Sequence, residues 1–185
     1  IELALKLEYT MRKLGAEAAA FDPIVGSGPR GALPHAIPWE RRVQVGDFIV
    51  IDMGCVYQGY CSDLTRTLVV GKPDAKQLEI YNTVLKAQLA ALEALRPGLT
   101  GKEVDTIARE IIKEAGYDRN FGHSLGHGVG LEIHEEPRLS QYNEEPLAPG
   151  VVVTVEPGIY LPGWGGVRIE DLAVVTDEGC DILTN

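Results

Sequence analysis

The sequence VGDFIVID at residues 45–52 has a turn glycine followed by an apolar run, and it ends in the carboxylate of Asp52. The sequence PGVVVTVE at residues 149–156 repeats this order and ends in Glu156. Short runs of β-branched and aromatic residues predict buried strands. We therefore predict two related halves, each of which brings a carboxylate to the end of a buried strand.

The next acidic positions extend this correspondence. Asp63 precedes the strand-like run 64–70, and Glu170 precedes the strand-like run 172–175. An ionised carboxylate that is buried alone is strongly disfavoured, so it needs a cation, an ion pair or a proton. Arg66 and Arg168 can each neutralise one acid, which leaves at least two acids unpaired. Four such acids in two matched pairs favour a metal site over strand ends that are merely capped or salt-bridged.

Apolar periodicity, glycine and proline predict the other elements of the 185-residue chain. Helices are predicted over 1–19, 75–95 and 102–115, and loop with short strand over 22–46. Strands are predicted over 48–52, 56–60, 64–70, 129–134, 151–156, 167–170 and 172–176. A chain of this length fits one α/β domain with a substantial core, so residues 1–185 are assigned to a single domain.

Composition excludes several classes of protein. A net charge of −10 argues against nucleic acid as a partner, and no run approaches the roughly 18 apolar residues of a membrane helix. Three cysteines at no ligand spacing are interpreted as reduced thiols, which favours a cytoplasmic location. The chain begins at Ile1 inside a helical pattern without a signal peptide, as expected for an excised domain.

Three histidines gather within the sequence GHSLGHGVGLEIHE at residues 122–135, namely His123, His127 and His134. The HExxH motif of zinc proteases is absent, and four glycines make a helix unfavourable here. Glycine instead allows the backbone to approach a metal or a substrate closely. The cluster therefore favours a functional site over histidines that only fill a core.

Carboxylate and imidazole donors suit manganese, cobalt, iron or zinc better than an ion that prefers thiolates. Four carboxylates balance two dications, an arrangement in which the ions share a carboxylate and a water. We therefore expect two divalent ions, with Mn²⁺ or Co²⁺ ahead of Zn²⁺ or Fe²⁺.

The complete set of motifs resembles a known family, the pita-bread metallopeptidases, which include methionine aminopeptidase, aminopeptidase P, prolidase and creatinase. The motifs are IDMG at 51–54, SDLTRT at 62–67, GHSLGHGVGLEIHEEP at 122–137, VEPGIY at 155–160 and VRIED at 167–171. The resemblance spans nearly the whole chain. It implies a pita-bread fold of the α+β class, in which a curved antiparallel sheet with pseudo-twofold halves holds the metals and helices cover its outer face.

The resemblance also implies a role for each metal ligand. Asp52 is expected to bind one metal, and Asp63 and Glu170 are expected to bridge both. His127 and Glu156 are expected to complete the second metal. A hydroxide that bridges the two ions is the expected nucleophile.

Further residues of the resemblance face the substrate. His134 is expected to donate a hydrogen bond to the tetrahedral oxyanion, a role that needs a pre-positioned donor. His35 matches the substrate-side histidine of the opposite wall, and His123 matches a position that either supports a metal ligand or lines the pocket. Either Glu170 or Glu156 is expected to act as the general base.

Two features are typical of the proline-specific branch. The separation of 14 residues between Glu156 and Glu170 (170 − 156) is short for a methionine aminopeptidase. Tyr160 and Arg168 are also typical of this branch and are predicted to contact substrate. For Arg168, a salt bridge to Asp171 or Glu170 is an equally open interpretation.

The predicted reaction is therefore hydrolysis of the N-terminal Xaa-Pro bond of a dipeptide or short peptide. Proline lacks an N–H and its ring constrains the chain, so general peptidases fit it poorly. Three alternatives stay open: removal of N-terminal residues as by methionine aminopeptidase, a non-catalytic peptide-binding module, and metal-independent chemistry on a small C–N substrate. An N-terminal domain, absent from this chain, is expected to help form a homodimer in the full-length protein.

Overall fold

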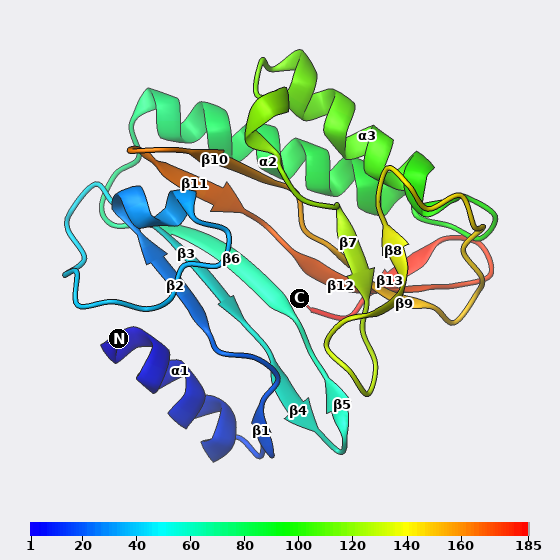
Figure 1. Cartoon of the computed structure of the whole chain (residues 1–185), viewed down its shortest axis with the longest axis horizontal. Coiled ribbons are helices and arrows are strands. Elements are labelled where there is room, and N and C mark those ends of the chain that lie inside the picture. Colours follow the sequence, from blue (N-terminus) through cyan, green and yellow to red (C-terminus); the bar gives the residue numbers. More distant parts are fainter. Residues whose placement is uncertain (185) are drawn as a thin grey trace.

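The computed structural model describes residues 1–184 (Figure 1). Its helices are α1 (Glu2–Lys13), α2 (Ala75–Ala94) and α3 (Gly101–Glu114), with 3-10 turns η1 (Gly28–Ala32) and η2 (Asp118–Asn120). Its strands are β1 (Ala18–Ala19), β2 (Ile24–Ser27), β3 (Phe48–Met53), β4 (Cys55–Tyr57), β5 (Tyr60–Cys61), β6 (Leu64–Val69), β7 (Gly126–Gly128), β8 (Glu135–Leu139), β9 (Val152–Val155), β10 (Gly158–Leu161), β11 (Gly165–Arg168), β12 (Asp171–Val175) and β13 (Cys180–Ile182).

The strands form antiparallel sheets that lie side by side (Figure 1). One sheet has the order β2-β3-β6, and a larger one has the order β13-β12-β9-β7-β8. Strands β10 and β11 form a hairpin, and β1-β4-β5 form a small third sheet. Between the two main sheets, the amide of Glu170 donates to the carbonyl of Thr65 at 3.1 Å, which joins β12 to β6.

The two main sheets repeat one arrangement of strands and acids. Strand β3 carries Asp52 and pairs with β6, which directly follows Asp63. Strand β9 directly precedes Glu156 and pairs with β12, which directly follows Glu170. Each half therefore delivers two carboxylates from neighbouring strand ends, as the match between residues 45–52 and 149–156 predicts.

Helices α2 and α3 pack together over the sheets, and α2 contacts β9, β10 and β11 (Figure 1). Helix α2 begins at Ala75 because Asp74 and Gln77 form a capping box, each side chain accepting a hydrogen bond from the other's backbone amide. The core between helices and sheets is apolar, and its fully buried members include Ile80, Ile112 and Val153.

Truncation of this core tests the packing. Ile80→Ala should lower the free energy of unfolding by about 2–5 kcal/mol, because Ile80 is 0% exposed on α2 and its removal leaves a cavity. The matched control is Leu78→Ala on the same helix, where the side chain is 47% exposed and a change within about 0.5 kcal/mol is expected. Urea unfolding measures both; equal losses would contradict this packing of α2.

The structure shortens the first predicted helix and divides one predicted strand. Helix α1 ends at Lys13 rather than at residue 19, because Gly15 adopts a left-handed φ of 111° and the chain then enters β1. The strand predicted over 56–60 is a hairpin of β4 and β5. Its turn is formed by Gln58 and Gly59, with φ values of 50° and 80°.

The strand predicted over 129–134 is wrong. Residues 129–134 form a loop between β7 and β8, and the paired strand is the glycine-rich segment before it. A Cβ on Gly126 would lie 1.9 Å from the carbonyl oxygen of Thr154, so glycine is needed for β7 to lie this close to β9. The prediction was based on the apolar residues of the loop, whereas the segment that pairs is the glycine-rich one at 126–128.

No helix within residues 1–184 combines the length and apolar character needed to cross a bilayer.

Candidate metal centre

A cavity of about 710 Å³ lies against both strand pairs. Nine of the ten residues singled out in the sequence line it, namely His35, Asp52, Asp63, His123, His127, His134, Glu156, Arg168 and Glu170. The tenth, Tyr160, is buried behind this lining. Apolar side chains, including Phe21, Ile24 and Ile133, complete the walls. A concave, largely apolar site with a few converging polar groups is typical of ligand binding.

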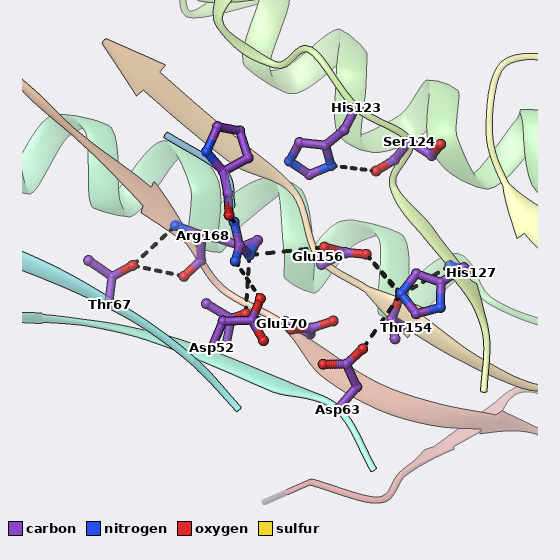
Figure 2. A network of polar contacts seen from close by, with 12 residues as sticks. Asp52, Asp63, Thr67, His123, Ser124, His127, Thr154, Glu156, Arg168 and Glu170 are labelled. Carbon is purple, nitrogen blue, oxygen red and sulfur yellow. Dashed lines mark hydrogen bonds and ion pairs between the residues drawn. The ribbon is translucent and has the colours of Figure 1, made fainter. Parts of the chain in front are cut away.

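The acids and His127 line this cavity, and their side chains converge on one another (Figure 2). One donor atom from each of Asp63, His127 and Glu170 lies within 4.8 Å of the others. The Nε2 atom of His127 lies 3.6 Å from an oxygen of Asp63 and 3.4 Å from an oxygen of Glu156. Donors at this spacing can surround a cation.

The tautomer of His127 is the one that can bind a cation through Nε2. Burial lowers the pKa of His127 to about 4, so the ring is neutral near pH 7. Its Nδ1 lies 3.0 Å from the carbonyl of Gly128 and can bond to it only as a donor. The Nε2 lone pair therefore faces Asp63 and Glu156, an arrangement that is repulsive unless a cation or a proton lies between them.

Asp52 supplies a second sign of a cation site. Its Oδ2 accepts a hydrogen bond from Arg168 at 2.5 Å. Its Oδ1 is buried without a hydrogen-bond partner among residues 1–184. A buried carboxylate oxygen without a partner is costly, and hard divalent cations bind such oxygens. The donor set of Asp52, Asp63, His127, Glu156 and Glu170 thus fits divalent metal.

Burial and mutual repulsion raise the pKa values of Asp63, Glu156 and Glu170 in the metal-free chain. Burial, followed by the charges of Asp52 and Glu156, raises the pKa of Asp63 to about 8. Burial raises the pKa of Glu156 to about 7, and that of Glu170 lies well above its ordinary value. Metal binding must displace these protons, so affinity for metal should increase with pH.

This proton linkage predicts a pH-dependent stability. An unfolded carboxyl group has a pKa of about 4, so the folded chain holds its proton on Asp63 more tightly than the unfolded chain does. His127, whose pKa is lowered from 6.5 to about 4, contributes with the opposite sign below pH 6.5, so stability of the metal-free chain should fall as pH rises from about 6.5 to about 8. Added Mn²⁺ should then raise the Tm by more near pH 8 than near pH 6. Calorimetry tests this; an equal or larger shift near pH 6 would contradict it.

Arg168 lies at the centre of a polar network (Figure 2). It is 3% exposed and donates to Asp52, to Thr65, to the carbonyl of Pro34 and to the hydroxyl of Tyr160. The guanidinium therefore pairs with Asp52 and also lies 4.0 Å from an oxygen of Glu156. Tyr160 in turn orients Arg168 from behind the cavity lining.

The alternative of a salt bridge from Arg168 to Asp171 or Glu170 is not formed among residues 1–184, and Arg168 pairs with Asp52 instead. Asp171 bonds to Arg66 at 2.7 Å and to Gln88 of α2 at 2.7 Å. Successive residues of an extended segment point to opposite faces, so Glu170 faces the cavity while Asp171 faces the helix.

The other histidines surround the same cavity. The ring of His134 lies 4.4 Å from that of His127, centroid to centroid, at an interplanar angle of 68°. His134 and His35 are exposed, and His35 follows η1 in a turn. His123 is half-buried, and burial lowers its pKa to about 4. Its Nε2 lies 2.9 Å from the hydroxyl of Tyr160.

Two threonines of the site were missed in the sequence. Thr65 donates to Glu170 at 2.6 Å, and Thr154 donates to Glu156 at 3.2 Å. Both hydroxyls are buried and orient a carboxylate of the cluster. The available signal was a polar residue within each buried strand, two positions from a predicted acid.

Residues 1–177 match the sequence profile of metallopeptidase family M24. The chain is 58% identical over 183 residues to the Xaa-Pro dipeptidase of Pyrococcus furiosus, a match that covers 99% of this chain and 53% of that protein. The chain thus spans about half the length of the curated relatives that it matches.

Solved structures agree with this match. The prolidase from Pyrococcus furiosus superposes with a TM-score of 0.98 at 58% identity, covering all of this chain and 55% of the prolidase. An X-Pro aminopeptidase from Thermotoga maritima gives a TM-score of 0.98 at 53% identity, covering all of this chain and 52% of that chain. The fold is therefore the pita-bread fold expected from the sequence.

Proposed function

Because the chain belongs to metallopeptidase family M24, we propose that it carries the metal centre of a peptidase that hydrolyses N-terminal Xaa-Pro bonds. The substrate is a dipeptide or short peptide with proline in the second position. Similarity to proteins named as Xaa-Pro dipeptidase and X-Pro aminopeptidase supports this substrate class.

Five residues form the proposed centre. Asp52, Asp63 and Glu170 would hold one divalent cation, and Asp63, His127, Glu156 and Glu170 would hold the other. Two cations held by these residues would supply a hydroxide nucleophile near neutral pH and would polarise the scissile carbonyl. Mn²⁺ and Co²⁺ are the proposed ions, since carboxylate oxygens dominate the donor set.

The surrounding residues bind the peptide substrate and orient the reacting groups. His134 is exposed at the cavity beside His127, where its ring can donate a hydrogen bond to the oxygen that gains charge during attack. His35 contributes a second imidazole to the same cavity. Glu170 or Glu156 takes the proton of the attacking water, and Thr65 holds Glu170 for this step.

The observation that carries this proposal is the unpartnered buried oxygen of Asp52 in a cavity where the His127 lone pair faces two carboxylates. These groups repel one another unless a cation or a proton lies between them. A binding module for peptides has no need of such a cluster, whereas a metallopeptidase does.

Peptide hydrolysis tests the proposal. The metal-stripped chain is assayed with Ala-Pro, Ala-Pro-Ala and Met-Ala before and after addition of Mn²⁺ or Co²⁺. Cleavage of the proline peptides that returns only with metal is expected. Preference for Ala-Pro identifies a dipeptidase, and preference for Ala-Pro-Ala identifies an aminopeptidase. Cleavage of Met-Ala alone, or cleavage unaffected by a chelator, would contradict the proposal.

A further inference from the structure

Asp105 and Arg109 form an ion pair outside the metal centre, in which Asp105 is buried and Arg109 is half-buried. They lie four residues apart on α3, and their side chains meet at 2.8 and 2.9 Å in a two-pronged contact. Asp105 is 0% exposed, so the pair is costly to bury unless it makes further hydrogen bonds.

Those further bonds all go to the backbone of residues 121–125. The guanidinium of Arg109 donates to the carbonyls of Phe121 at 3.0 Å and His123 at 2.9 Å. The carboxylate of Asp105 accepts from the amide of Leu125 at 3.0 Å. One ion pair thus holds three backbone groups within five residues, and Arg109 also stacks on the ring of Phe121 at 4.2 Å.

This segment connects α3 to the cavity. It carries His123 and Ser124, which line the cavity, and it leads directly into β7 with His127. The carbonyl of Leu125 accepts from the amide of Glu156 at 2.8 Å. A shift of residues 121–125 would therefore move His123 and the backbone beside Glu156 together.

We propose that Asp105 and Arg109 are positioning residues that fix residues 121–125, and through them the His123 side chain, against the metal centre. The kinetic consequence rests on the proposed peptidase function. The geometric consequence, the placement of the His123 ring, does not.

Arg109→Lys separates positioning from simple stabilisation. Lysine keeps a positive charge beside Asp105. If the ion pair only stabilised α3, the variant would therefore keep most of that stabilisation. A single ammonium cannot reproduce the planar fork that reaches Asp105 and two carbonyls at once. The matched control is Lys113→Met, which removes an exposed ion pair with Glu110 on the same helix.

Two readouts decide the proposal. The first is kcat/KM for Ala-Pro, measured on metal-loaded protein whose metal content is determined. In Arg109→Lys, kcat/KM should fall by about 10- to 100-fold while the metal content stays unchanged, because small misplacements of reacting groups lower rates by this much. The second is the NMR signal of the His123 ring N–H, which donates to the carbonyl of Ser124 at 2.8 Å. The chain has four histidines, so the signal is assigned by its loss in His123→Ala.

We expect the His123 signal to shift or broaden in Arg109→Lys and to stay unchanged in Lys113→Met. An Arg109→Lys protein with wild-type kcat/KM and an unchanged His123 signal would overturn the positioning role. Were the wild-type protein to cleave no peptide, the proposed function would fail, and the His123 signal alone would decide the positioning role.

Discussion

Glu170→Gln is expected to lower the metal-restored cleavage of Ala-Pro by more than about 100-fold. Loss of a residue that only orients a ligand already costs about 10- to 100-fold in metal affinity or activity, and Glu170 is proposed to touch both cations. Glu170 is 1% exposed, and its oxygen accepts a hydrogen bond from Thr65 at 2.6 Å. An amide would fill the same space but would lack the negative charge that holds the cations. The measurement is kcat/KM at saturating Mn²⁺.

The matched control for this variant is Glu178→Gln, which makes the same change at an exposed site beyond the end of β12. Its activity should equal that of the unchanged chain. If Glu170→Gln also retained full activity, Glu170 would hold no metal and the proposed centre would be wrong.

Arg168→Met is expected to lower the free energy of unfolding of the metal-free chain by about 3–5 kcal/mol. The variant removes one partner of a buried ion pair. Asp52 then lies near Asp63, Glu156 and Glu170 without the guanidinium that pairs with it. The variant also removes one of the two hydrogen bonds of the Tyr160 hydroxyl, the one accepted from Arg168 at 2.8 Å. Urea unfolding of the metal-stripped protein near pH 8 gives the value.

The control for Arg168→Met is Arg12→Met, which breaks an exposed ion pair with Glu8 on α1. Exposed pairs contribute about 0–1 kcal/mol, so a small change is expected there. Similar losses in the two variants would show that the network around Arg168 carries no special stability.

The convergence of the acids could be predicted from the sequence, because an ionised carboxylate at the end of a buried strand needs a partner. The sequence alone places Asp52 and Glu156 at the ends of such strands. The structure brings both together with His127 in one cavity. Their role as metal ligands stays a prediction that metal binding must test.

Strand register could not be predicted in the same way. The partner of Arg168 depends on which face each residue of 168–171 occupies, and a shift of one residue exchanges Glu170 with Asp171. The position of β7 depends on the space between Gly126 and the carbonyl of Thr154, which is a contact between distant segments. The pattern of apolar residues along one segment contains neither kind of information.

The most direct test of the central claim is the number of Mn²⁺ ions that bind to the metal-stripped chain near pH 8, measured by equilibrium dialysis and elemental analysis. We expect two ions per chain, with fewer in Asp52→Asn and in His127→Ala. A chain that binds no Mn²⁺, or that binds two ions undiminished in both variants, would contradict the claim.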